Sequence, residues 1–282
     1  MRFISFDHNG RHGFGLLRGD GVVDLTGKLA PEIVTLKQAI AAGLLARAGE
    51  WTGRPADLPL ADLSLLPVIP DPGKILCVGL NYEDHRRETK RPDSEYPTLF
   101  TRFADSQVGH GQPLLKPSFS SRFDYEAELA VIIGAPAHGV SEEGALDFVD
   151  GYACYNDGSV RDWQRHTSQF TPGKNFPATG GFGPALVTPD EIGDYRQLPI
   201  RLRLNGTTMQ DATLSDLIFP IEKLIAYCSA FTPLSPGDVI VTGTPGGVGD
   251  RREPPVYLQD GDRVEVDIGA VGCLINGVAV VR

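Results

Sequence analysis

The stretch DYEAELAVII, residues 124–133, decides the fold class because it joins two glutamates to an unbroken apolar run. A short run rich in Val and Ile is typical of a buried strand. Residues two apart in a strand point to the same face, so Glu126 and Glu128 project together. Like charges this close repel, and a divalent cation would relieve the repulsion. The alternative is an exposed strand end with both carboxylates solvated.

Short strand patterns recur along the rest of the chain. Its 33 glycines and 22 prolines have no collagen-like period and indicate many turns. We expect a strand-rich α+β protein. The expected strands lie at 74–80, 124–134, 151–157, 185–188, 200–205, 238–242 and 263–268, and the expected helices at 32–48, 141–148, 159–165 and 220–230.

A Pro-rich segment, LPVIPDPG at residues 66–73, separates the beginning of the chain from the rest. Residues 1–26 have the pattern of a meander of hairpins. Residues 32–48 have apolar side chains spaced three and four apart, as in one amphipathic helix. We therefore place a domain boundary near residue 70, with a small N-terminal α+β domain over 1–70 and a larger domain over 71–282.

The charge composition restricts the class of partner. The chain has 26 basic and 36 acidic residues and a formal net charge of −10. An acidic surface repels phosphate backbones and anionic lipid, so we expect neither nucleic acid nor a membrane as partner. The sequence shows no signal-peptide pattern, and its four cysteines form no CxxC pair. We expect a reduced, cytoplasmic protein.

A third candidate metal ligand ends the strand pattern at 151–157. With the two glutamates, Asp157 would form an oxygen-only set, which suits Mg²⁺ or Mn²⁺ better than Zn²⁺. Arg161 and Gln164 follow four and seven residues later, on one helix face directed back toward Asp157. The alternative is an aspartate that caps a turn or a helix.

A candidate general base lies in the segment NYEDHRRE, residues 81–88. His85 and Glu88 are three residues apart and would meet on one helical turn. A carboxylate beside an imidazole orients the ring and raises its basicity. The alternative is a surface histidine in a highly charged segment.

Two Gly-containing loops offer groups for an anion. Lys174, in TPGKNF, can act as a point charge for an oxyanion or a substrate carboxylate. Thr244, in TGTPGGVG, adds a hydroxyl beside free backbone N–H groups, although this loop lacks the ending of a phosphate loop. The alternatives are an exposed loop lysine at 174 and a plain Gly/Pro turn between strands at 242–249. Whether His110 is structural or lines the site stays open.

Five segments, in order along the chain, resemble the fumarylacetoacetate hydrolase family over residues 74–282. They are NYEDHRRE at 81–88, DYEAEL at 124–129, NDGSVRDWQ at 156–164, GK at 173–174 and GTPGG at 243–247. The resemblance implies the family's mixed β-roll catalytic domain and, commonly, a homodimer. It implies Mg²⁺ or Mn²⁺ held by Glu126, Glu128 and Asp157.

The resemblance also implies roles for the remaining candidates. A His85–Glu88 dyad would handle water or protons. Four side chains would contact oxygens of a small 2-oxo acid substrate: Arg161, Gln164, Lys174 and Thr244.

The main expectation is a Mg/Mn-dependent hydrolase that cleaves the C–C bond of acylpyruvate-type 2,4-dioxo acids. His85 would then activate water and Lys174 would stabilise the oxyanion. The alternative on the same site is a decarboxylase of oxaloacetate-like acids or an enol–keto isomerase (tautomerase). A third possibility, a catalytically silent binding protein, is disfavoured because His85 and every implied ligand are present.

Overall fold

The computed structural model describes residues 1–281. A large mixed β-sheet forms the centre of the fold. Its order is β4 (Leu58–Pro59), β3 (Gly21–Asp24), β2 (Arg11–Arg18), β1 (Arg2–His8), β14 (Gly180–Val187), β12 (Val149–Asn156), β11 (Ala127–Ile133), β17 (Val239–Val241), β6 (Ile75–Gly79) and β7 (Thr98–Arg102). Two short strands pair off this path, β5 (Ser64–Leu65) with β1 and β8 (Gln107–Val108) with β14.

A second sheet packs against the first. Its order is β16 (Thr207–Thr213), β15 (Pro199–Leu204), β18 (Arg263–Asp267), β19 (Cys273–Val280) and β9 (Leu114–Lys116). A separate short ladder joins β10 (Phe123–Asp124) to β13 (Ser159–Val160). The α-helices are few and short: α1 (Leu36–Ala41), α2 (Glu83–Glu88), α3 (Arg161–Gln164), α4 (Thr171–Lys174) and α5 (Ile221–Phe231). The expected strand-rich α+β class is therefore confirmed.

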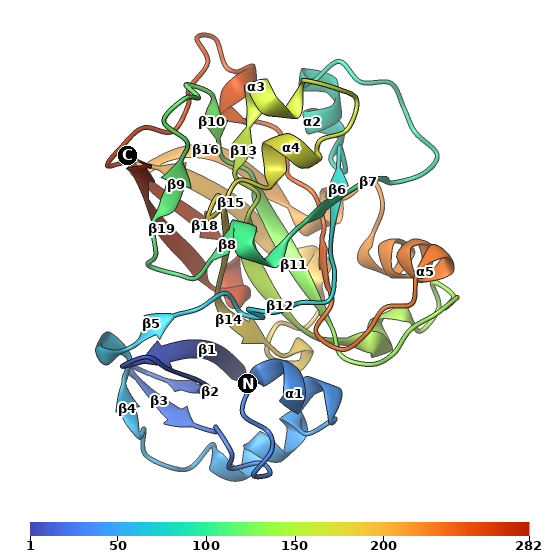
Figure 1. Ribbon diagram of the computed structural model, residues 1–282. Coiled ribbons are helices and arrows are strands. Elements are labelled where there is room, and N and C mark those ends of the chain that lie inside the picture. Colours follow the sequence, from blue (N-terminus) through green and yellow to red (C-terminus); the bar gives the residue numbers. More distant parts are fainter. Residues whose placement is uncertain (282) are drawn as a thin grey trace.

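β11 is buried on both faces, which explains its continuous apolar run. Leu129, Val131 and Ile133 pack into one hydrophobic core, and Ala130 and Ile132 pack into another on the opposite face. In Figure 1, β11 lies deep in the molecule, with α2, α3 and α4 gathered near one end and the N-terminal strands at the other. The acidic start of β11 faces those helices.

Two predicted helices are wrong. Residues 32–48 do not form one helix, because Gly43 adopts a positive φ of 65° between α1 and a 3₁₀ helix at Leu45–Trp51. Both pieces bury apolar residues in the same core, which explains the continuous helical spacing. Residues 141–148 contain only a 3₁₀ turn, Ala145–Phe148, after Gly144 with a φ of 81°.

The N-terminal strands continue the large sheet, since Arg2 and Phe3 of β1 pair with Val187 and Leu186 of β14. The domain boundary near residue 70 stays a prediction. The four cysteines are free. Among residues 1–281, no helix has the length and apolarity needed to cross a membrane.

Candidate metal and active site

The three predicted metal ligands come together. One carboxylate oxygen from each of Glu126, Glu128 and Asp157 lies within 4.8 Å of the others, and all three side chains are buried. The pairing of β11 with β12 brings this about, because the N–H of Asp157 donates to the carbonyl of Glu126 at 2.9 Å. The alternative of solvated carboxylates at an exposed strand end is excluded.

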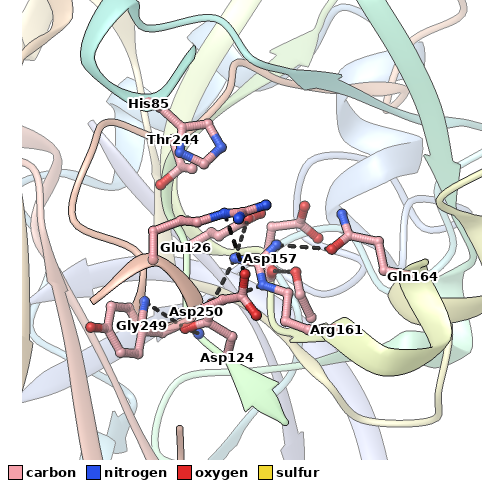
Figure 2. Close-up of polar contacts among 12 residues, drawn as sticks. His85, Asp124, Glu126, Asp157, Arg161, Gln164, Thr244, Gly249 and Asp250 are labelled. Carbon is pink, nitrogen blue, oxygen red and sulfur yellow. Dashed lines mark hydrogen bonds and ion pairs between the residues drawn. The ribbon is translucent and has the colours of Figure 1, made fainter. Parts of the chain in front are cut away.

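Three buried cations surround the ligands. Lys174 Nζ lies 2.6 Å from Glu126 Oε2 and 2.5 Å from Asp157 Oδ2. Arg161 lies 2.7 Å from Glu126 Oε1, on the opposite side of that carboxylate. Arg102 donates to Asp157 Oδ1 at 2.5 Å. Figure 2 shows how Arg161 points toward Glu126.

Glu128 differs from its neighbours because no ion pair reaches it from any residue between 1 and 281. Its Oε2 accepts only the N–H of Gly243, at 2.6 Å. Burial, followed by the charges of Asp157 and Glu126, raises the pKa of Glu128. Burial would also raise the pKa of Glu126, but Arg161 and Lys174 outweigh it and lower that pKa.

This charge pattern fits a divalent cation. With every group ionised, four buried carboxylates (Asp124, Glu126, Glu128 and Asp157) face three buried cations (Arg102, Arg161 and Lys174), which leaves one negative charge in excess. Buried like charges without compensation are costly. An all-oxygen donor set with this excess suits Mg²⁺ or Mn²⁺.

The predicted dyad is formed. His85 Nδ1 lies 2.7 Å from Glu88 Oε1, and Glu88 Oε2 accepts the N–H of Gly247 at 2.9 Å. His85 is buried rather than on the surface. With Nδ1 engaged, Nε2 has no hydrogen bond to any described residue and is the ring atom available to a ligand. Glu88, held from two sides, fixes the orientation of the ring.

Thr244 has an oriented hydroxyl. Its Oγ1 accepts a hydrogen bond from Gln210 Nε2 at 2.8 Å, so its own proton is free for a ligand. Gln210 is fixed in turn by the N–H of Ala127, which donates to Oε1 at 2.9 Å. Gln164 accepts from Arg161 at 3.0 Å, which leaves its amide nitrogen free to donate.

A cavity of about 560 Å³ connects these groups. Its lining includes seven predicted site residues: His85, Glu126, Glu128, Arg161, Gln164, Lys174 and Thr244. Glu88 and Asp157 do not line it. His110 does not line the cavity, and its Nδ1 accepts the N–H of Ile275 at 3.1 Å.

Sequence reasoning missed several polar residues that support the site. Asp124 stood inside the quoted motif, and its carboxylate binds Arg161 Nε at 2.8 Å. Arg102 and Gln210 lie in ordinary strands, and nothing in their local sequence marks them. Arg161 was expected to point back toward Asp157, but it binds Asp124 and Glu126 instead.

The family model for the fumarylacetoacetate (FAA) hydrolase C-terminal domain matches residues 74–279, and the chain belongs to this family of enzymes. Oxaloacetate tautomerase fahd2 of Xenopus laevis, mitochondrial, is 44% identical over 77% of this chain and 69% of its own length. Mitochondrial oxaloacetate tautomerase FAHD2A of Bos taurus is 38% identical over 99% of this chain and 91% of its own length.

A solved structure with the same fold contains a manganese ion. Maleylpyruvate hydrolase from Sphingobium sp. SYK-6, in complex with manganese (II) ion and pyruvate, superposes with a TM-score of 0.84 and 30% identity over the full length of both chains. The manganese in that relative and the buried acidic triad here support a divalent metal site.

The expectation of a C–C bond hydrolase is wrong. Curated relatives at 38–44% identity include several named oxaloacetate tautomerases, whereas the maleylpyruvate hydrolase is more distant at 30%. The motifs could not separate these activities, because an acidic triad with a His–Glu dyad suits water activation and proton transfer alike. The mitochondrial relatives do not support the predicted cytoplasmic location, which stays a prediction, as does the homodimer.

Proposed function

We propose that this protein is a Mg²⁺- or Mn²⁺-dependent tautomerase that interconverts the enol and keto forms of oxaloacetate or a close 2-oxo diacid. The relatives named oxaloacetate tautomerases support this activity. The observation that carries it is the His85–Glu88 hydrogen bond of 2.7 Å at the wall of a cavity that also contains the acidic triad. A proton-transfer group and a 2-oxo acid site are the two parts that tautomerisation needs.

The carboxylates of Glu126, Glu128 and Asp157 would hold the metal ion. When bound, the ion supplies a Lewis acid that stabilises negative charge on the 2-oxo oxygen. This role agrees with the excess negative charge of the buried cluster.

Other side chains would bind and orient the substrate. Lys174 and Arg161 present buried cationic donors to the carboxylate and the enol oxygen. Thr244 offers a hydroxyl proton and Gln164 an amide N–H. Because these donors are already held by protein contacts, little ordering is required when the substrate binds.

His85 would move the proton at carbon 3. In ketonisation the O–H bond of the enol breaks, its proton leaves to solvent, and a C–H bond forms at carbon 3 with a proton from Nε2. Glu88 accepts the hydrogen bond of Nδ1 and stabilises the cationic ring before this transfer. In the reverse direction Nε2 takes the proton from carbon 3.

The test follows the ultraviolet absorbance of the oxaloacetate enol in the presence of Mg²⁺ or Mn²⁺, with pyruvate and CO₂ measured in parallel. We expect fast loss of the enol without matching release of pyruvate. In D₂O the enzyme should speed deuterium incorporation at carbon 3. Release of pyruvate and CO₂ as fast as the enol disappears would overturn the tautomerase in favour of a decarboxylase.

A further inference from the structure

One carboxylate at the wall of the cavity is bound by two arginines. The side chain of Asp250 is 4% exposed, and its Oδ2 forms ion pairs with Arg165 and, at 3.4 Å, with Nε of Arg251. Its Oδ1 accepts the hydroxyl of Tyr257 at 2.8 Å. Asp250 therefore holds both guanidinium groups beside the cavity that they line.

Asp124 ties this arginine pair to the inner part of the site. Its Oδ1 accepts the N–H of Gly249 at 2.9 Å, and its Oδ2 accepts the N–H of Asp250 at 3.0 Å. The same carboxylate binds Arg161 Nε at 2.8 Å. Figure 2 shows Asp124 between Arg161 on one side and Gly249 and Asp250 on the other. Arg161 and the turn at Gly249–Arg251 are thus both held by the buried carboxylate of Asp124.

The positive charges of Arg165 and Arg251 are only partly neutralised. Two guanidinium charges face the single carboxylate of Asp250, which leaves an excess of one positive charge. The side chains of Arg165 and Arg251 are 42% and 37% exposed, whereas that of Arg161 is 6% exposed. The cavity therefore has a buried end, where Arg161 is paired beside the acidic triad, and a more open end with an excess positive charge at Arg165 and Arg251.

Two other arginines that line the cavity, Arg86 and Arg91, do not combine an anchor with an unmatched charge. Arg86 is bound by Glu83 and Asp93, so its charge is matched. Arg91 is exposed and has no ion pair or side-chain hydrogen bond within residues 1–281 that would hold its guanidinium in place. Arg165 and Arg251 combine an anchor with unmatched charge, the condition for a preorganised anion site.

We propose that Arg165 and Arg251 form a subsite for the second carboxylate of a dicarboxylic 2-oxo acid, and this proposal rests on the proposed function. The 2-oxo acid end of the substrate lies at the acidic triad and Lys174, and its far carboxylate lies between the two guanidinium groups. The subsite selects diacids over monoacids.

The experiment compares the wild type with Arg165→Ala, Arg251→Ala and Arg165→Lys. Arg201→Ala is the matched control, because Arg201 is 41% exposed, is paired with Asp211 at 2.9 Å and does not line the cavity. We expect KM for oxaloacetate to rise about tenfold or more in each alanine variant while kcat changes less than about twofold. Arg165→Lys should lose less because it keeps the charge.

Binding of malate and lactate to the Mg²⁺-loaded proteins, measured by calorimetry, tests the subsite without turnover. The two ligands share a 2-hydroxy acid end and differ by the far carboxylate. We expect the wild type to prefer malate and both alanine variants to lose that preference. Equal loss of both ligands, or no preference for malate in the wild type, would overturn the subsite.

Failure of the proposed function gives a different result. In that case the wild type does not speed the loss of the oxaloacetate enol, yet the comparison of malate with lactate still decides whether Arg165 and Arg251 select a diacid.

Discussion

Arg102 donates a hydrogen bond to Oδ1 of Asp157 at 2.5 Å, and neither side chain is exposed to solvent. The same guanidinium donates to the carbonyl of Gly158 at 2.9 Å and to Thr179 Oγ1 at 2.8 Å. These contacts fix one edge of the Asp157 carboxylate and leave Oδ2 directed toward Lys174. A residue that does not line the cavity thereby sets the orientation of a predicted metal ligand.

Replacing Arg102 with Met should strongly destabilise the metal-free protein. The change leaves Asp157 with one buried edge unpaired, and breaking a buried ion pair typically costs about 3–5 kcal/mol. Urea unfolding measures this loss. The double variant Arg102→Met/Asp157→Asn should be more stable than Arg102→Met alone, because the uncompensated charge is removed. Equal stability of the single and double variants would contradict this account. Arg201→Ala, at an exposed pair, should cost only about 0–1 kcal/mol.

The two glutamates of the acidic triad were predictable because their shared face depends on a local rule. Glu126 and Glu128 are two residues apart at the start of one buried run, and Asp157 ends another. That these two runs are neighbouring strands followed from the family resemblance, not from the run patterns themselves. The His85–Glu88 pair was predictable for a similar reason, since a single helical turn brings residues three apart into contact.

The supporting residues were not predictable because they depend on long-range contacts. Arg102 meets Asp157 across 55 positions, and Gln210 meets Thr244 across 34. No local period encodes such a contact. The helix expected at 32–48 fails for a different reason. Apolar spacing shows only which side chains face the core. The spacing continues on both sides of Gly43, although the backbone leaves the helical conformation at that residue.

Glu128→Gln should separate metal binding from folding. Glu128 is buried without a cationic partner, so neutralising it should leave the metal-free protein at least as stable as the wild type. Mg²⁺ at 100 times its Kd should stabilise the wild type by about 2.7 kcal/mol and the variant far less. Thermal unfolding with and without Mg²⁺ measures both effects. The exposed variant Glu142→Gln should keep the full response to Mg²⁺. An undiminished response in Glu128→Gln would remove Glu128 from the ligand set.

His85→Ala should slow tautomerisation while sparing metal binding. General acid–base catalysis contributes about 10²–10⁴-fold, and the imidazole is outside the predicted ligand set. Glu88→Gln should give a smaller loss, because the ring remains but is less well oriented and its cation is less stabilised. The enol absorbance assay gives the rates, and Mn²⁺ titration gives the affinities. Loss of Mn²⁺ affinity in His85→Ala that matches the loss of rate would assign His85 to the metal instead.

His110 should make the fold sensitive to acid. Burial, and then the charge of Arg263, lower the pKa of His110 from its ordinary value of 6.5. Its Nδ1 accepts the N–H of Ile275 at 3.1 Å, a contact that requires this nitrogen to be unprotonated. The folded state therefore binds this proton less readily than the unfolded chain does. The contribution to stability is complete above pH 6.5 and is lost as the pH falls through the lowered pKa of the folded state.

His110→Asn keeps an acceptor near the position of Nδ1 but does not titrate, so its stability should fall less between pH 7 and pH 5 than that of the wild type. Urea unfolding at a series of pH values measures the difference, with the exposed His138→Asn as control. The same pH dependence in His110→Asn and the wild type would show that this histidine does not contribute to the acid sensitivity.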